Sequence, residues 1–76
     1  MSPRLPRVTA PELLRALLKD GWFVARHSGS HAILRHATKP GRVVVAKHPG
    51  AIVKPKTLQD ALDDAGLTAE ELRDLL

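Results

Sequence analysis

The 76-residue sequence contains no cysteine, which excludes both a disulfide framework and a thiolate metal site. It has no apolar run near the roughly 18 residues that span a membrane, and its start lacks the hydrophobic segment of a signal peptide. We therefore expect a cytoplasmic protein. The length allows one small domain, residues 1–76, and the hydrophobic 43% of the chain must supply its core, because nothing covalent holds the fold.

Aromatic residues are also scarce, since Trp22 and Phe23 are the only two in the chain. Proteins that splay RNA bases apart stack them on several aromatic side chains. Such stacking is therefore not expected to dominate here. Recognition of a polymer's backbone and shape fits the composition better.

Charge is distributed unevenly along the chain. Residues 1–56 carry eleven Lys or Arg against two acids, a net charge of +9, whereas residues 57–76 carry one Arg against six acids, a net charge of −5. A basic surface of this size favours a polyanion as partner, because each phosphate that Lys or Arg neutralises releases a condensed counterion. The alternative is a basic, soluble surface without a specific partner.

Start and stop signals delimit a first helix from about Ala10 to Asp20. The spacing of Thr9 and Glu12 predicts a capping box, in which each residue satisfies a backbone N–H of the other. Gly21 is placed to be the left-handed cap at the end of the helix. Four apolar residues recur at helical spacing and form one face that predicts packing on a core: Leu13, Leu14, Leu17 and Leu18.

Three short strands are predicted after this helix, because aromatic and β-branched residues lie between turn signals. They run from Trp22 to His27, from His31 to Ala37 and from Arg42 to His48. The turns between them are Ser28-Gly29-Ser30 and Thr38-Lys39-Pro40-Gly41.

The middle strand has apolar side chains on both of its faces. Its period of two separates one set of residues from the other: His31, Ile33 and Arg35 on one face, and Ala32, Leu34 and His36 on the other. Alternation therefore does not say which face meets the helices.

Two further helices are predicted after a loop from Ala51 to Pro55. The first opens at Thr57, has apolar residues at helical spacing and ends at Gly66. The second follows a capping box formed by Thr68 and Glu71. The order α-β-β-β-α-α predicts a small α+β domain of two layers, in which helices cover one face of a three-stranded antiparallel sheet.

A glycine-containing turn, Ser28-Gly29-Ser30, delivers His31 to the first position of the middle strand. Histidine is the only side chain whose unperturbed pKa, about 6.5, allows proton transfer near neutrality. Basic residues lie on both sides of it in the sequence: Arg26, Arg35, Lys39, Arg42 and Lys47. A proton-transfer group among positive charges suggests chemistry on a phosphate-bearing polymer. The alternative is a turn followed by an ordinary surface histidine.

The order and spacing of these features resemble the HicA toxin family of bacterial type II toxin–antitoxin systems. The resemblance covers nearly all of the residues expected to be ordered, through the following segments: Leu5 to Thr9, Gly21-Trp22, Gly29-Ser30-His31, Arg35-His36, Val45 to His48, Thr57-Leu58 and Ala65-Gly66-Leu67. The Gly-Ser-His element ahead of a strand is the hallmark of this family. Two positions depart from the usual pattern, with Ala46 in place of proline and Lys56 in place of glycine.

The resemblance implies a double-stranded-RNA-binding-like fold and a toxin that cleaves mRNA without the ribosome and is neutralised by a HicB-type antitoxin. It also implies that His31 is the catalytic residue of a metal-independent endoribonuclease. RNA supplies its own nucleophile, the 2′-hydroxyl, so one histidine can act as general base or general acid. The RNA contacts are expected from the turn and from the basic side chains: Arg26, Ser28, Gly29, Ser30, Arg35, Lys39, Arg42 and Lys47.

No second acid–base group is evident in the sequence. His36 and His48 are candidates only if the fold brings them close to His31, and His27 is a candidate either for RNA contact or for a cross-strand surface pair. The histidines lack the spacing of a helical two-histidine zinc site, so we expect no metal and no cofactor. The alternative function is a non-catalytic nucleic-acid-binding module with the same basic face.

Overall fold

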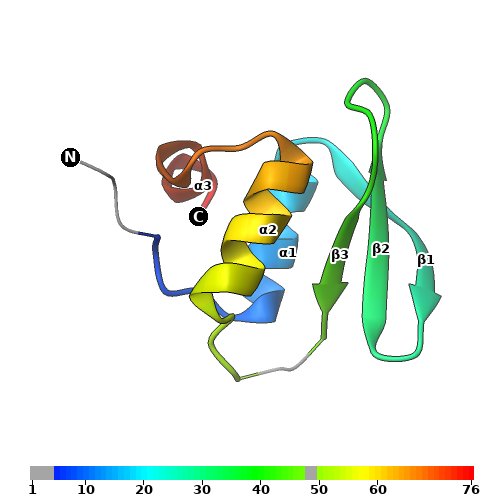
Figure 1. Cartoon of the computed structure of the whole chain (residues 1–76). Helices are drawn as coiled ribbons and strands as arrows, with labels where there is room; N and C mark the ends of the chain where they lie inside the picture. The colour runs from blue at the N-terminus through cyan, green and yellow to red at the C-terminus, as the bar shows by residue number, and fades with distance from the viewer. Residues whose placement is uncertain (1–4, 48–49) are drawn as a thin grey trace.

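The computed structural model describes residues 5–47 and 50–76, which form three helices and a three-stranded antiparallel sheet (Figure 1). The elements follow the predicted order: α1 (Ala10–Lys19), β1 (Trp22–Ser28), β2 (His31–His36), β3 (Val43–Ala46), α2 (Pro55–Ala65) and α3 (Ala69–Leu75). The predicted α+β class and the antiparallel sheet are confirmed.

The start of α1 is the predicted capping box. The Glu12 N–H donates to Thr9 Oγ1 over 3.3 Å, and the Thr9 N–H donates to Glu12 Oε1 over 2.9 Å. The helix ends at Lys19, one residue before the predicted end, and Gly21 follows with φ of 101°. A Cβ on Gly21 would lie 2.7 Å from His36 Nε2, so both the backbone angle and the close approach of β2 require glycine there.

The sheet has the strand order β1-β2-β3, so β2 is central. Ser28 pairs with His31 across a two-residue turn, and His31 pairs with Ala46 on the other side. The third strand is shorter than predicted, because regular pairing begins at Val43 rather than Arg42 and the described strand ends at Ala46. The predicted end of this strand, His48, lies outside the described residues.

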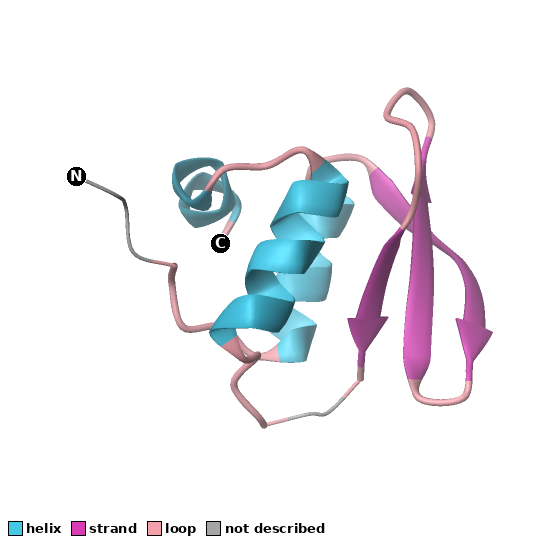
Figure 2. Cartoon of the chain, in the orientation of Figure 1, coloured by secondary structure: helices cyan, strands magenta, loops and turns pink. Residues whose placement is uncertain are grey.

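Helices α1 and α2 lie side by side against one face of the sheet, and α3 lies beyond them (Figure 2). The sheet face beneath them is apolar and buried, with Ala32 and Leu34 of β2 fully inaccessible to solvent. The core around it also contains these residues: Leu13, Leu17, Trp22, Val43, Val45, Leu58, Leu62 and Leu72. The face of β2 that the sequence left undecided is therefore settled, since His31, Ile33 and Arg35 lie on the face that no helix covers.

Helix α2 begins two residues before the predicted start, so the prediction that Thr57 opens it is wrong. Its first residue is Pro55, and Lys54 occupies the cap position without a side-chain cap bond. Proline suits a first helical position, because its fixed φ is already helical and its missing N–H would have no partner there. The predicted end at Gly66 and the Thr68–Glu71 capping box of α3 are confirmed.

None of the described helices combines the length and the apolar character that a membrane span needs.

The α1 capping box gives the fold a defined pH dependence. The backbone N–H and the hydroxyl of Thr9 donate to the Glu12 carboxylate and hold its pKa below the ordinary value. A carboxyl group whose pKa is lowered by folding adds stability above its unfolded-state pKa, and this contribution is lost as the pH falls through the folded-state pKa. We predict that Glu12→Gln lowers stability near neutral pH and reduces the loss of stability on acidification to about pH 3.

Urea denaturation across this pH range measures the effect. Glu70→Gln is the control, because Glu70 lies in the first turn of α3 while Glu71 makes that helix's capping box. An unchanged acid sensitivity in Glu12→Gln, equal to that of Glu70→Gln, would show that the capping box does not contribute it.

Candidate functional site

His31 lies at the end of the sheet where the β1–β2 turn meets β2. Its neighbours across the strands are Ser28 in β1 and Ala46 in β3, and its side chain is exposed. Gly29 has φ of 59°, the left-handed angle that a primed hairpin turn requires at its first central residue. The turn that delivers His31 therefore depends on this glycine.

Two arginines share the uncovered face of the sheet with His31. Arg26 pairs with Ile33 and Arg35 pairs with Phe23, and side chains of directly paired residues lie on the same face. Arg26 is thus a diagonal neighbour of His31, at a spacing of about 7–8 Å between the backbones. Arg35 lies four residues along β2, about 13 Å away. Both side chains are exposed, so His31 faces solvent beside two cations.

A β-bulge in β1 places Arg26 on this face. Val24 pairs with Leu34 and Arg26 pairs with Ile33, so Ala25 has no cross-strand partner. The extra residue reverses the alternation of side chains beyond it. Strict alternation from the buried Trp22 would instead have turned Arg26 toward the helix side. The sequence gives no local signal for this bulge, because β1 contains no proline or glycine.

Apolar side chains also lie on the uncovered face, and sequence reasoning missed them. Phe23 is 50% exposed and Val44 is 41% exposed, while Ile33 between them is half-buried. Three consecutive valines are typical of an inner strand, which concealed that the middle one points away from the core. We call the set Phe23, Arg26, Ser28, His31, Ile33, Arg35 and Val44 the open face.

Lys47 joins the same end of the sheet through its backbone. Its N–H donates to the Ser30 carbonyl over 2.7 Å, which ties the residue after β3 to the turn. Its Nζ lies 2.9 Å from His27 Nδ1, and because an ammonium only donates, Nδ1 is the acceptor. This is the cross-strand pair that was one of the two alternatives for His27. By alternation, both side chains point to the opposite side of the sheet from His31.

Lys39 lies at the other end of the sheet, in a polar cluster that joins three elements. Its Nζ is 2.6 Å from Asp20 Oδ2, after α1, and 3.0 Å from the Ala65 carbonyl, at the end of α2. The Trp22 indole N–H donates to the same Asp20 carboxylate over 3.2 Å. The Lys39 ammonium is therefore engaged in holding the helix ends, and the fold does not bring it to His31. Arg42 is exposed at this far end, next to β3.

His36 belongs to the same cluster and has a structural role. Its Nδ1 accepts the backbone N–H groups of Thr38 and Lys39, each over 3.1 Å. Nε2 therefore carries the ring hydrogen and donates to the Asp20 carbonyl over 2.8 Å. The ring also packs edge-on against Trp22. His36 lies five residues from His31 along β2, a distance of about 17 Å. The fold therefore does not bring His36 close enough to His31 to act as a second acid–base group on the same phosphate. The other candidate, His48, lies outside the described residues.

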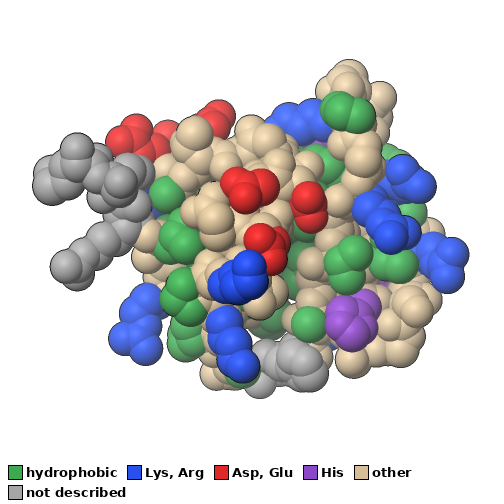
Figure 3. Space-filling model, viewed as in Figure 1, with side chains coloured by type: hydrophobic (Ala, Val, Ile, Leu, Met, Phe, Trp, Pro, Cys, Tyr) green, Lys and Arg blue, Asp and Glu red, His purple; other side chains and the backbone are tan. Residues whose placement is uncertain are grey.

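Acidic side chains gather on the helix side of the molecule, whereas basic side chains occur on both sides. Figure 3 shows acidic side chains gathered over α2 and toward α3, whereas basic side chains surround the strands and the start of α2. Among residues 5–47 and 50–76, no group of three or more His, Cys, Asp or Glu is arranged to hold a metal ion. At this site, the His31 imidazole can transfer a proton, and the guanidinium groups of Arg26 and Arg35 can attract an anion.

A comparison with known protein families finds a match over most of the chain. The model of the HicA toxin of bacterial toxin–antitoxin systems matches residues 10–67, a span that contains α1, the whole sheet, α2 and the turn before His31. No curated protein matches the chain closely enough to be a relative. The match covers well over half of the chain and includes every element that positions His31. The protein therefore belongs to the HicA family of toxins, whose members act in pairs with an antitoxin.

Proposed function

We propose that this toxin is an endoribonuclease that cleaves mRNA without the ribosome and without a metal ion, and that a HicB-type antitoxin neutralises it. The observation that carries the proposal is the exposed His31 on a sheet face that also presents Arg26 and Arg35. A toxin needs a harmful activity, and this face combines a proton-transfer group with cations that suit a phosphate backbone.

The proposed reaction uses the nucleophile that RNA itself carries. The 2′-hydroxyl oxygen attacks the adjacent phosphorus and loses its proton, while the bond from phosphorus to the 5′-oxygen breaks and that oxygen gains a proton. His31 takes up the first proton or supplies the second, and either role contributes roughly 10²–10⁴-fold to the rate. The exposure of its ring allows the scissile phosphate to approach from solvent.

The open face also has groups to stabilise the charge that builds on the phosphate. Arg26 is the nearest arginine across the strands, and its side chain is long enough to bridge the diagonal spacing to a phosphate held at His31. Ser28, directly opposite His31, and the N–H groups of Gly29 and Ser30 in the turn supply further donors. Donors already in place where charge develops give the largest electrostatic benefit.

The RNA backbone would continue from His31 along the basic side chains of the sheet. Arg35 lies further along the open face and Arg42 precedes β3, whereas the Lys47 side chain points to the opposite side of the sheet and contacts His27, so Lys47 is not part of this path. Lys39 is left out of this path because its ammonium is bound to Asp20 and to the end of α2. The acidic side chains of α2 and α3 would repel RNA from the surface of these two helices, which favours an approach to the open face.

Replacing His31 tests the catalytic assignment. We predict that His31→Ala lowers the RNA cleavage rate by at least about 10²-fold, because one side of the proton transfer is lost. The fold should persist, since the His31 side chain is exposed. The measurement is cleavage of a labelled RNA in the presence of chelator, with circular dichroism to verify folding. His27→Ala is the matched control, because His27 is exposed at the same end of the sheet but on its other side.

Two results would contradict this assignment. A folded His31→Ala protein that cleaves at the wild-type rate would remove His31 from the mechanism. A wild-type protein that shifts RNA mobility without cleaving it would instead establish the non-catalytic binding module.

The salt dependence of binding tests the RNA path. In the His31→Ala background, we predict that Arg26→Ala and Arg35→Ala each reduce the slope of log affinity against log salt by roughly 0.7–0.9, because each removes one phosphate contact. Fluorescence anisotropy with a labelled RNA measures the slope. Lys39→Ala is the control: it should lower the free energy of unfolding by removing the bond to Asp20, yet leave the slope unchanged. A slope that changes with Lys39 and not with either arginine would move the RNA to the other end of the sheet.

A further inference from the structure

β3 is an edge strand, and one side of its backbone faces away from the sheet. The Lys47 N–H donates to Ser30 of the hairpin turn, and in antiparallel pairing the backbone groups of alternate residues turn to the same side. Val45 and Val43 therefore face β2, whereas the N–H and C=O of Val44 and Ala46 point outward. Within residues 5–47 and 50–76, no other backbone group bonds to these outward groups.

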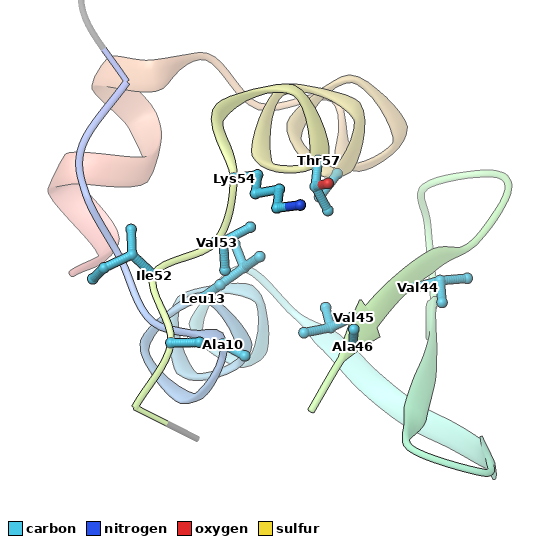
Figure 4. A pocket seen from close by; sticks show the side chains of 11 residues that line it. Ala10, Leu13, Val44, Val45, Ala46, Ile52, Val53, Lys54 and Thr57 are labelled. Carbon is cyan, nitrogen blue, oxygen red and sulfur yellow. The ribbon is translucent and has the colours of Figure 1, made fainter. Parts of the chain in front are cut away.

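A groove runs along this outward side of β3. Its volume is about 330 Å³, and its walls are the edge of β3 on one side and the start of α1 with residues 51–54 on the other. Figure 4 shows Val45 and Ala46 across from Ala10, Ile52 and Val53, with Lys54 and Thr57 at the α2 end. Ile52 is 46% exposed, so the groove offers apolar surface to a ligand that pairs with the strand.

The charges around the groove all have one sign. Arg42 precedes β3 and Lys47 follows it, and Lys54 is the one charged residue among the described residues that line the groove. Within residues 5–47 and 50–76, no Asp or Glu lines it. A ligand that lies against β3 therefore meets an apolar centre with a cation at each end.

The same charges disfavour pairing between two copies of β3. Antiparallel self-pairing centred on Val45 would bring Arg42 of one copy to within one position of Lys47 of the other, at both ends. The two cations at each end would project to opposite faces of the sheet, so their repulsion acts only over a longer distance, but basic residues that flank an edge strand are a common protection against such pairing. A strand with an acidic residue at each end would convert this repulsion into attraction.

We propose that β3 binds a β-strand of a partner protein, and that this strand has an apolar centre and an acidic residue at each end. Its backbone would pair with the outward groups of Val44 and Ala46, and alternate side chains would enter the groove. The added strand would lie about 10 Å from β2, two strand spacings away, and would bring its protein up to the open face beside His31. That the partner is the antitoxin rests on the proposed function, whereas the strand geometry does not.

A synthetic peptide tests the strand docking without reference to RNA cleavage. The probe is the capped peptide Glu-Val-Thr-Val-Thr-Glu, and the same peptide with Lys at both ends is its control. Hydrogen exchange followed by NMR reads the Val44 and Ala46 amides directly. At a concentration about ten times its Kd, the acidic peptide should slow their exchange about tenfold, because about one-tenth of the protein then stays free. The Lys-ended peptide should leave both amides unchanged.

A pair of variants separates backbone pairing from side-chain contact. Ala46→Pro removes an outward N–H that makes no bond within the sheet, a position where an edge strand tolerates proline, and it should weaken peptide binding. Ala46→Val keeps this N–H and should bind as the wild type does. Circular dichroism shows that each variant is folded, and Val44 exchange reports binding in both.

Three results would overturn the proposal. The first is that the acidic peptide leaves the exchange of both amides unchanged. The second is that Ala46→Pro and Ala46→Val bind the peptide equally well. The third is that sedimentation shows a dimer of the protein in which these amides are already protected without peptide. If the wild-type protein binds the peptide but does not cleave RNA, only the proposed function is contradicted.

Discussion

The burial of one sheet face beneath α1 and α2 is the interaction on which the rest of the structure depends. Ala32 and Leu34 are fully buried there, and a chain of 76 residues has little left with which to cover the opposite face. The other side of β2 therefore stays in contact with solvent and carries His31 and Arg35. The small size of the chain also leaves β3 as an edge strand. The solvent-exposed position of His31 and the free edge of β3 both follow from a core that covers only one face of a three-stranded sheet.

The two ends of β2 differ in how their histidines are bonded and exposed. At one end His31 follows a turn and has an exposed ring, and at the other His36 is bonded through both ring nitrogens and packed against Trp22. Lys39 completes the second end by linking Asp20 to the last turn of α2. This polar cluster fixes the helix layer on the sheet, and the turn at the other end remains accessible to a substrate.

Local signals in the sequence predicted most of the fold. Capping boxes and glycine caps depend on residues close together in the chain, so both boxes and the Gly21 and Gly66 positions were predictable. Contacts distant in sequence were not: the Ala25 bulge comes from pairing with β2, and Lys39 engages groups that only the folded chain brings together. The covered face of β2 was undecided for the same reason. The position of His31 at the start of β2 was predictable from its turn, whereas the half-exposed Phe23 beside Arg35 was not.

The most direct test of the central claim, that the open face binds and cleaves RNA, is NMR of the wild-type protein with an RNA whose 2′-hydroxyls are replaced by hydrogen. Without its nucleophile this RNA should bind uncut. The account predicts that the side-chain signals of His31, Arg26 and Arg35 shift on binding, while those of α2 and α3 stay in place. Shifts confined to the helices, or cleavage of the modified RNA, would contradict it.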